Sequence, residues 1–520
     1  MLKPYAYLFA IFALLFLSSG CGTNPVTHKR ELQLVSESQE ISIGQENYIP
    51  ARQQQGGDYI IDAELTAYVQ SVGNKLAAVA DRPLPYEFVV LNDSVPNAWA
   101  MPGGKIAFNR GLLYELDSEA ELAAVLSHEI VHAAARHGAQ KMETGMLLQG
   151  AVAAVGVAAQ DNSYGNLIVG GAQLSSQLIS TKFGRDEESE ADLYGMRYMK
   201  KAGYDPRAAV TLQETFVRLS KDHRSNFIDG LFASHPPSDA RVAANKATLA
   251  ALGEGGEWGK EIYAQKVGKL KSTQAAYKAY DDGVKALAKG DLKQADALAK
   301  QAIAAEPREA RFRELQGDIA MKQNRSEEAL GHYQQAIEMQ PDYFRPYVQK
   351  GIALNNLGRA AEAEPLLKRS NELLPTATSH FVLGQIAEGR GDADSALQQY
   401  EIAAGSNSAV GKSSMARLVR LDLPRNPGKY LQAAAQPDDM GYVYAAVYNP
   451  TSTAVTNVYV RVVRFDAVTR QPNAQSDPLL VAARLDPRQR GQVLLEGVRV
   501  YTQADLKLLR VLIVRAELAK

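Results

Sequence analysis

The chain has 520 residues, more than one hydrophobic core usually organises, which predicts roughly three or four domains. An apolar fraction of 46% and a charged fraction of 22% are those of an ordinary folded protein. The 57 Lys and Arg residues are balanced by 58 Asp and Glu residues, and no basic tract occurs, so nucleic acid is not an expected partner.

The first 20 residues are typical of an export signal. Lys3 supplies the positive start, and Tyr5 to Leu17 form an apolar run that is short for a membrane span. Ser18-Ser19-Gly20-Cys21 resembles the lipobox of bacterial lipoproteins, although its first residue is not the usual aliphatic one, and Cys21 is the only cysteine in the chain. We therefore expect lipidation of Cys21. Gly22 rather than Asp follows, which by resemblance to the lipoprotein sorting rule of enteric bacteria implies the periplasmic face of the outer membrane, with the soluble periplasm as the alternative.

The next informative element is a helix that begins near residue 118. Ser118 is expected to be its N-cap, with Glu121 closing a capping box, and apolar residues recur at helical spacing until Gly138. Inside it lies His128-Glu129-Ile130-Val131-His132. Histidines four residues apart share one helix face and can bind one tetrahedral zinc ion, while Glu129 can take a proton from a metal-bound water. The alternative, two surface histidines beside a glutamate, explains less of the pattern.

A catalytic zinc site needs a third protein ligand. The acidic segment 185–192 leads into a second helical stretch and offers Glu187, Glu188 and Glu190, and the spacing alone leaves these three open. His137 lies one turn and one residue beyond the second histidine of the motif, so we expect it at a solvated helix end, away from the metal.

These motifs together resemble the M48 family of zinc metallopeptidases, in which a second helix carries Glu, three residues, then Asp. The resemblance implies that Glu188 is the third ligand of one zinc ion per chain, and that Asp192 is its companion. An Asp there can accept the second ring N–H of His128 or His132 and so orient it. The family also implies a gluzincin-type α+β domain, here over residues 21–252.

Two further segments extend the resemblance. Asn97 to Gly104, followed by Lys105 to Phe108, is similar to the family's turn and edge strand, which can hold unfolded substrate by strand addition. The loop Ser234 to Ser238 contains His235 between a serine and two prolines. His235 is expected to be catalytic, either as a donor to the oxyanion or as a residue that fills the open zinc position and silences the enzyme. A local structural role is the alternative.

A 34-residue period begins after residue 265. A small residue where two helices cross, and a proline after the second helix, at this period resemble the tetratricopeptide repeat. We expect about four repeats over residues 265–405, forming an α-solenoid, with an ordinary helical bundle as the alternative. The recurring columns are Gly283, Gly317, Gly351 and Gly384; Ala295, Ala329, Ala363 and Ala396; and Pro307, Pro341 and Pro375.

The last segment, 437–520, changes to alternating Val, Tyr and Leu without helical insertions, which predicts a small β-sandwich with a binding or assembly role. Five or more strands are expected, among them Tyr442 to Tyr448, Val455 to Phe465, Leu479 to Ala483, Gln492 to Val500 and Leu508 to Ala516.

The chain is thus expected to be multidomain and mainly α-helical. A catalytic M48 domain followed by repeats resembles the BepA-like periplasmic proteases. This implies a zinc endopeptidase that hydrolyses misfolded or misassembled envelope proteins, with Glu129 as the base. The repeats would recruit substrate or the outer-membrane assembly machinery. The alternative is a chaperone-like scaffold for outer-membrane protein assembly with a latent metal site.

Overall fold

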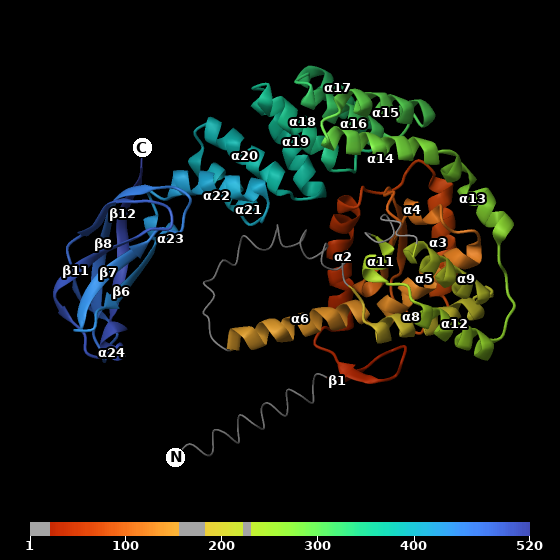
Figure 1. Cartoon of the computed structure of the whole chain (residues 1–520), viewed down its shortest axis with the longest axis horizontal. Helices are drawn as coiled ribbons and strands as arrows, with labels where there is room; N and C mark the ends of the chain where they lie inside the picture. The colour runs from red at the N-terminus through yellow and green to blue at the C-terminus, as the bar shows by residue number, and fades with distance from the viewer. Residues whose placement is uncertain (1–20, 155–181, 222–229, 520) are drawn as a thin grey trace, which may run out of the picture. The chain divides into compact units, whose positions relative to one another are not determined.

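The computed structural model describes residues 21–154, 182–221 and 230–519, so the expected signal peptide, residues 1–20, lies outside it. The chain forms two compact units; among the described residues, the first ends at Pro375 and the second starts at Thr376. Each unit is described by itself (Figure 1). The expectation of a mainly helical chain with a repeat solenoid and β-sheets is confirmed.

A small three-stranded sheet stands beside the predicted metal helix. Its order is β3 (Glu87–Leu91), β5 (Lys105–Asn109) and β4 (Ala98–Met101), with β3 parallel and β4 antiparallel to β5. The expectation that residues 105–108 form an edge strand is wrong, because this segment is the central strand. The edge nearer the metal helix belongs to β4 instead. Its position could not be read locally, since strand order is set by tertiary packing.

Helices surround this sheet in the first unit (Figure 1). The metal helix α5 packs against α3, α8 and α9. A short hairpin of β1 (Cys21–Thr23) and β2 (Arg30–Leu32) precedes them. The helices are α2 (Glu37–Gln54), α3 (Ala63–Ala77), α4 (Arg110–Leu113), α5 (Glu119–Ala134), α6 (His137–Ala154), α8 (Arg185–Lys201), α9 (Arg207–Lys221), α11 (Leu231–Ser234) and α12 (Asp239–Leu252), with a 3₁₀ turn at Pro102–Gly104.

The ends of α5 differ in detail from the expectation. Ser118 is the N-cap, and its hydroxyl accepts from the Glu121 amide at 3.2 Å, but the Glu121 carboxylate accepts from the Asp117 amide rather than closing a capping box. The helix ends at Ala134, before Gly138. Arg136 adopts a φ of 64°, and this left-handed residue turns the chain into α6.

The repeats are pairs of antiparallel helices. In the first unit α13 (Lys260–Ser272) leads into the pairs α14 with α15, α16 with α17, and α18 with α19. The second unit begins with the pair α20 and α21, followed by α22 (Ala409–Asp422) and α23 (Pro427–Tyr430). The pairs span Gln274–Ala288 and Leu292–Ala305, Ala310–Lys322 and Ser326–Met339, Arg345–Asn356 and Ala360–Leu373, and Ala377–Gly389 and Ala393–Ala404.

A buried polar cluster joins the domain that contains α5 to the first repeats. The Arg110 side chain is 1% exposed, lies 3.5 Å from the centre of the Tyr277 ring, and donates to Asn92 at 2.8 Å. Asn92 donates to Glu309 at 3.0 Å, and the Tyr277 hydroxyl donates to the same carboxylate at 2.7 Å. Because a buried charge is costly unless it is paired and hydrogen-bonded, this cluster fixes the repeats to the domain.

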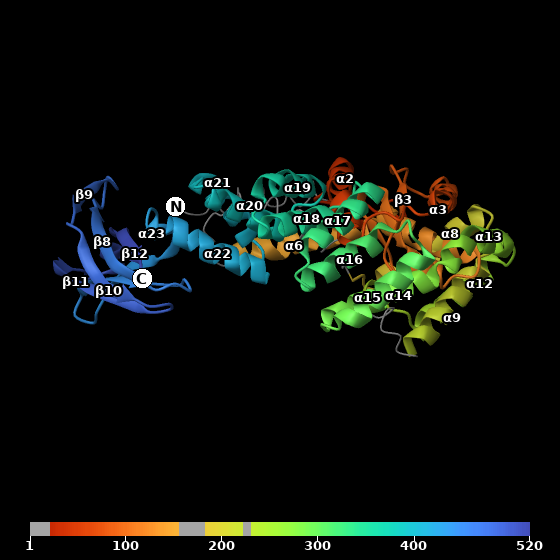
Figure 2. The same cartoon turned by 90° about the horizontal axis from the view of Figure 1, so that it is seen from above.

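The second unit ends in two antiparallel sheets that share one hydrophobic core (Figure 2). One sheet has the order β11-β7-β6 and the other β10-β8-β12, with β9 paired to β8. The sheets start at β6, before the expected start at 437, and β9 was not anticipated, because both have exposed residues without the apolar alternation. The elements are β6 (Gln432–Pro437), β7 (Tyr442–Tyr448), β8 (Val455–Phe465), β9 (Pro472–Gln475), β10 (Leu479–Leu485), β11 (Arg490–Arg499), α24 (Gln503–Leu506) and β12 (Leu509–Leu518).

Within the described parts of the chain, no helix combines the length and the apolar character needed to cross a bilayer.

The glycine column of the repeats yields a stability prediction. A Cβ added to Gly317 would meet the Tyr333 ring at 2.4 Å, and that ring is held by a 2.8 Å hydrogen bond from its hydroxyl to Asp318. We expect Gly317→Ala to destabilise the repeats by about 1–3 kcal/mol through overpacking. Gly331 lies in the facing helix with nothing within 4 Å of its added Cβ. Gly331→Ala is therefore the matched control and should be stabilising by up to ~1 kcal/mol.

Thermal unfolding followed by helical circular dichroism compares the two variants with the wild type. Equal unfolding midpoints for Gly317→Ala and Gly331→Ala would contradict this account of the glycine column.

Candidate metal centre

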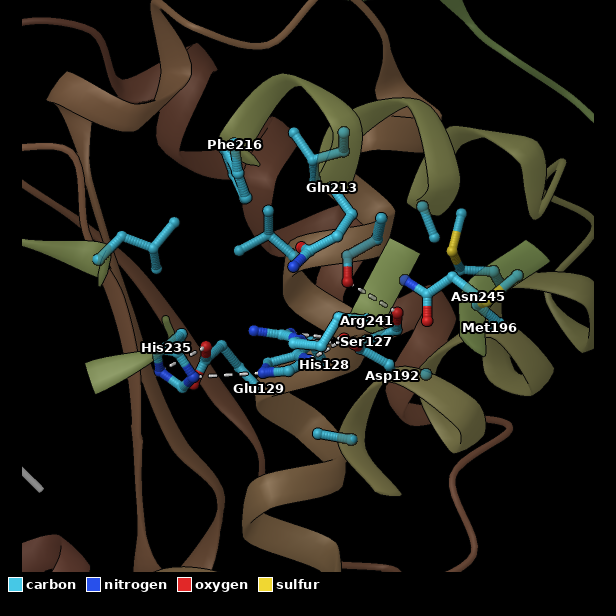
Figure 3. Close-up of a pocket in the computed structure, with 18 residues that line it drawn as sticks. Ser127, His128, Glu129, Asp192, Met196, Gln213, Phe216, His235, Arg241 and Asn245 are labelled. Carbon is cyan, nitrogen blue, oxygen red and sulfur yellow. Dashed lines mark hydrogen bonds and ion pairs between the residues drawn. The ribbon is translucent and has the colours of Figure 1, made fainter. Parts of the chain in front are cut away.

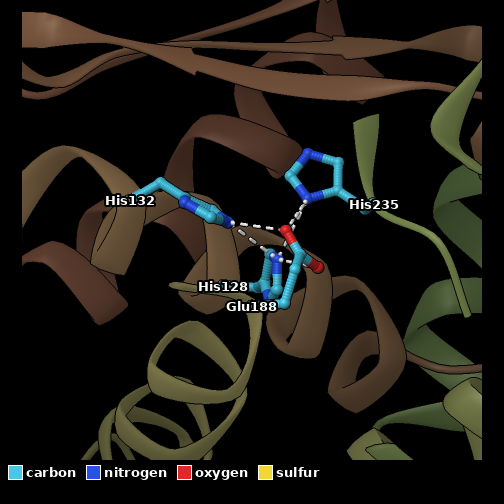
Figure 4. A group of neighbouring side chains, drawn as sticks. All are labelled: His128, His132, Glu188 and His235. Atoms are coloured by element: carbon cyan, nitrogen blue, oxygen red, sulfur yellow. Dashed lines mark hydrogen bonds and ion pairs between the residues drawn. The ribbon is translucent and has the colours of Figure 1, made fainter. Parts of the chain in front are cut away.

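Four side chains from three segments converge on one point (Figure 4). His128 and His132 come from α5, Glu188 comes from α8, and His235 follows the short helix α11. One ligand atom from each lies within 4.8 Å of the others. The structure therefore brings together the three expected ligands and the loop histidine that sequence reasoning left between several roles.

The spacing of these atoms fits a zinc ion. Nε2 of His128 lies 3.0 Å from Nε2 of His132 and 3.3 Å from Nδ1 of His235, and Nε2 of His132 lies 3.4 Å from Oε1 of Glu188. A tetrahedral zinc with bonds of about 2.0–2.1 Å separates its ligand atoms by roughly 3.3–3.4 Å. The ring nitrogens and the carboxylate lie this close because their lone pairs point to one place. A cation at that place would bind all of them.

His128 is oriented from behind by an acid and an arginine. Its Nδ1 lies 3.0 Å from Oδ1 of Asp192, which leaves Nε2 directed at the cluster. Arg241 donates to both oxygens of Asp192, at 2.8 and 2.7 Å. Burial works to raise the pKa of Asp192, but Arg241 and His128 hold this pKa below its usual value, so the carboxylate stays ionised. Between the two partners that the sequence left open for Asp192, the structure selects His128.

Glu188 is the most enclosed of the acids on α8. It is 3% exposed, and its Oε2 lies 2.7 Å from Nη1 of Arg241. Burial works to raise the pKa of Glu188, but His235 and His128 beside it hold this pKa well below the usual value. The other two candidates lie outside the cluster, since Glu187 contacts Lys141 and Glu190 contacts Lys29.

His132 is buried and neutral. Its ring stacks on Phe183 with centroids 3.9 Å apart. Burial holds the pKa of His132 well below its usual value, so the imidazole carries no charge at neutral pH, which is the state that binds a metal.

Glu129 stands beside the cluster without a strong partner. It is 1% exposed, neither carboxylate oxygen has a hydrogen-bond partner among the described residues, and Oε1 lies 3.5 Å from Nε2 of His235. Burial raises the pKa of Glu129 above its usual value. A buried carboxylate left this way costs free energy, so its retention beside possible metal ligands points to chemistry.

Sequence reasoning was wrong about His137 and incomplete about Arg241. His137 is 1% exposed, not solvated, and its Nδ1 lies 2.8 Å from Nδ1 of His132. Helical spacing could not anticipate this contact, because the left-handed Arg136 interrupts the helix between the two histidines. Arg241 lies in α12, beyond the His235 loop, and no spacing rule indicates that it reaches two acids on α8.

An apolar pocket opens beside the histidines (Figure 3). His128, Glu129 and His235 are among its lining residues, and apolar side chains from α5, α8 and α9 make up most of the remainder. Gln213 lies in this wall with its buried Nε2 unpaired among the described residues. The apolar lining consists of Ala124, Val125, Ala191, Gly195, Met196, Met199, Ala209, Leu212, Phe216 and Leu231.

Comparison with known protein families agrees with this geometry. Residues 63–249 match peptidase family M48, and residues 280–344 and 348–409 match the tetratricopeptide repeat. The M48 match includes the metal helix, Glu188 on α8 and the His235 loop.

Named relatives extend over more of the chain. The beta-barrel assembly-enhancing protease of Escherichia coli (strain K12) is 26% identical over 377 residues, which are 64% of this chain and 74% of that protein. The protein of the same name from Yersinia pestis is 28% identical over 351 residues, 61% of this chain and 70% of its own. The mitochondrial metalloendopeptidase OMA1 of Schizosaccharomyces pombe is 33% identical over 225 residues, 42% and 63% of the two chains. This chain is therefore a metalloendopeptidase with a domain that matches peptidase family M48, followed by tetratricopeptide repeats, and its group of His and Glu side chains can hold the zinc ion that this family uses.

Proposed function

We propose that this metalloendopeptidase hydrolyses misfolded or misassembled envelope proteins, with one zinc ion held by His128, His132 and Glu188. The observation that carries the proposal is the buried, unpartnered carboxylate of Glu129 beside three converging ligand side chains. A purely structural metal site would have no use for such a carboxylate. The names of the relatives, which refer to the assembly of β-barrel proteins, support the choice of substrate class.

Each residue of the site has a chemical task in this proposal. When bound, zinc supplies Lewis acidity toward the scissile carbonyl and lowers the pKa of a bound water. Glu129 would accept a proton from the attacking water and pass it to the leaving amine nitrogen. Burial raises the pKa of Glu129 toward the working pH, which suits a group that must first accept a proton and then release it. Asp192 and Arg241 keep His128 and Glu188 in position.

Substrate would be held by its backbone and by one side chain. The edge of β4 offers unpaired backbone groups for strand addition, which favours broad specificity. The apolar pocket beside Glu129 suits an apolar side chain next to the scissile bond. The repeats add a surface that can recruit the substrate or the outer-membrane assembly machinery.

The position of His235 favours a resting state with restrained activity. Its Nδ1 lies 2.8 Å from Oε1 of Glu188 and 3.3 Å from Nε2 of His128, among the atoms expected to bind zinc. As a fourth ligand it would occupy the position that a catalytic zinc keeps open for water. The same observation sustains the second candidate function, a chaperone-like scaffold for outer-membrane protein assembly whose metal site is mostly latent.

For localisation we propose the periplasmic face of the outer membrane, with a lipid anchor on Cys21. Cys21 is the first residue of β1, which pairs with β2. A lipid anchor at this position would hold the protease at the membrane where envelope proteins are assembled. The soluble periplasm is the alternative.

The ligand set is tested by metal analysis of purified variants. His128→Ala, His132→Ala and Glu188→Ala should lose stoichiometric zinc, because two remaining ligands do not hold the ion. Glu187→Ala is the matched control on the same helix and should keep it, because Glu187 contacts Lys141 instead of the cluster. Zinc released by Glu187→Ala but retained by Glu188→Ala would overturn the assignment.

Proteolysis is tested by digesting an unfolded protein with the wild type beside Glu129→Gln. The variant should keep zinc and lose turnover, since the amide cannot accept the proton. Mass spectrometry of the products should show apolar residues enriched on one side of the cut, as the pocket requires. Zinc-loaded wild type that cleaves no faster than Glu129→Gln would favour the scaffold function.

His235→Ala is expected to raise basal proteolysis, because it empties the coordination position that water needs, while zinc content hardly changes. Peptide cleavage should be compared with the wild type at equal zinc occupancy and matched thermal stability. A fall of roughly a hundredfold would instead assign His235 to oxyanion stabilisation. Equal rates would leave it only a local loop role.

Cys21→Ser should block lipid attachment and move the protein out of the membrane fraction. One acyl chain binds membranes only marginally whereas several anchor stably, so the wild type should resist a salt wash. Mass spectrometry of the N-terminal peptide identifies the acyl groups directly. A mature wild type found wholly in the soluble periplasm would contradict the anchor.

A further inference from the structure

We propose that His137 is a positioning residue for zinc, holding His132 through a hydrogen bond, with Glu190 and Lys29 behind His137. This inference rests on the proposed function, since it concerns the same metal site. It starts from the contact between two ring nitrogens, Nδ1 of His132 and Nδ1 of His137, which lie 2.8 Å apart. Both rings are buried, so water does not compete for this bond.

A zinc ion bound at the cluster would fix the direction of that hydrogen bond. Nε2 of His132 faces the ligand cluster and must present a lone pair to zinc, so a neutral His132 carries its proton on Nδ1. Nδ1 of His132 therefore donates, and Nδ1 of His137 accepts. A ligating histidine usually donates its second ring N–H to an acceptor in this way, which fixes its tautomer and orientation.

His137 must then carry its own proton on Nε2. That atom points toward an acid, because it lies 3.5 Å from Oε2 of Glu190. The other oxygen of Glu190 accepts from Lys29 Nζ at 2.6 Å. A carboxylate facing Nε2 stabilises the tautomer that leaves Nδ1 free to accept from His132. Glu190 thus has a task behind the ligand, although it was first considered as a ligand itself.

The backbone around His137 is built to hold it there. The preceding Arg136, with its φ of 64°, is 4% exposed and its guanidinium contacts Glu31, Glu40 and Glu143 at 3.1, 2.5 and 3.1 Å. Asn24 donates to the carbonyl of Ala135 at 2.9 Å. A buried arginine is tolerated only with such pairing, so residues of the N-terminal segment fix the turn between α5 and α6.

The two ligand histidines of α5 then have parallel supports. His128 is held by Asp192, which Arg241 holds in turn, and His132 is held by His137 through to Lys29. Each support ends on a cation, Arg241 behind Asp192 and Lys29 behind Glu190, and this cation keeps the acid ionised. The two supports differ because the neutral imidazole of His137 lies between His132 and Glu190, whereas Asp192 contacts His128 directly.

Zinc affinity tests the proposal directly. Full-length protein with Glu129→Gln, which prevents self-digestion, serves as the parent, and its zinc dissociation constant is measured by competition with a chelator. Adding His137→Leu should weaken zinc binding roughly 10- to 100-fold, the usual effect of losing a residue that orients a metal ligand. The absorption spectrum of the cobalt-substituted protein should change as well, because the ligand field changes when His132 reorients.

Two polar variants separate a hydrogen bond from packing. His137→Asn places an acceptor oxygen near the position of Nδ1 and should recover much of the affinity. His137→Gln is the control, since its amide reaches toward the position of Nε2, and it should remain weak. Unchanged thermal unfolding of the metal-free proteins shows that the fold is intact. If His137→Leu does not fold, the comparison of Asn with Gln carries the test.

Two outcomes would overturn the proposal: equal zinc affinity of His137→Leu and its parent, or an Asn variant that binds no better than the Gln variant. Failure of the proposed function looks different, because the parent itself would bind no zinc or would bind it equally well after His128→Ala.

Discussion

The close packing of α5 against α8 is the contact on which the metal centre depends. A Cβ added at Gly195 of α8 would lie 3.2 Å from Oγ of Ser127 and 3.3 Å from the backbone nitrogen of His128. A larger residue at this position would therefore push the two helices apart by several tenths of an ångström. Glu188 and Asp192 lie roughly two turns and one turn before Gly195. The separation of the helices thus decides whether one acid reaches the ligand cluster and the other reaches the back of His128.

This packing brings several carboxylates together in a buried place, where their negative charges must be balanced by nearby cations. Arg241 contacts both Glu188 and Asp192. A single guanidinium cannot balance two carboxylates and the nearby Glu129, so a bound divalent cation improves the electrostatics of the whole cluster. The same reasoning explains why Glu129 can remain without a hydrogen-bond partner, because an adjacent metal and its water would supply one.

Local patterns in the sequence predicted the residues that carry the chemistry better than they predicted the residues packed around them. The spacing of His128 and His132 follows from helical periodicity, and the alternation in Val455 to Phe465 marked β8 over its whole length. Glu188 was distinguished from Glu187 and Glu190 only through resemblance to a family, since all three lie in the first two turns of α8.

Features that depend on the turn geometry or on tertiary order were missed. The burial of His137 follows from one left-handed residue, Arg136, whose conformation is set by carboxylates more than 90 residues away in the chain as well as by nearby Glu143. Likewise, β4 rather than β5 forms the sheet edge because of how the strands pair, and alternation within a strand carries no information about its neighbours.

The buried cluster around Arg110 determines what the repeats can contribute to catalysis. Arg110 lies in α4, only a few residues before the metal helix, and it stacks on Tyr277 of α14 while Asn92 bonds to Glu309. Separating the first repeats from the domain would leave these charged and polar groups buried without partners, so the two move as one body. For the recruitment proposed here, a segment bound by these repeats would then be held at a set distance from the zinc ligands. The gain would come from effective concentration rather than from added contacts at the cleavage site, which suits a protease with broad specificity at the scissile bond.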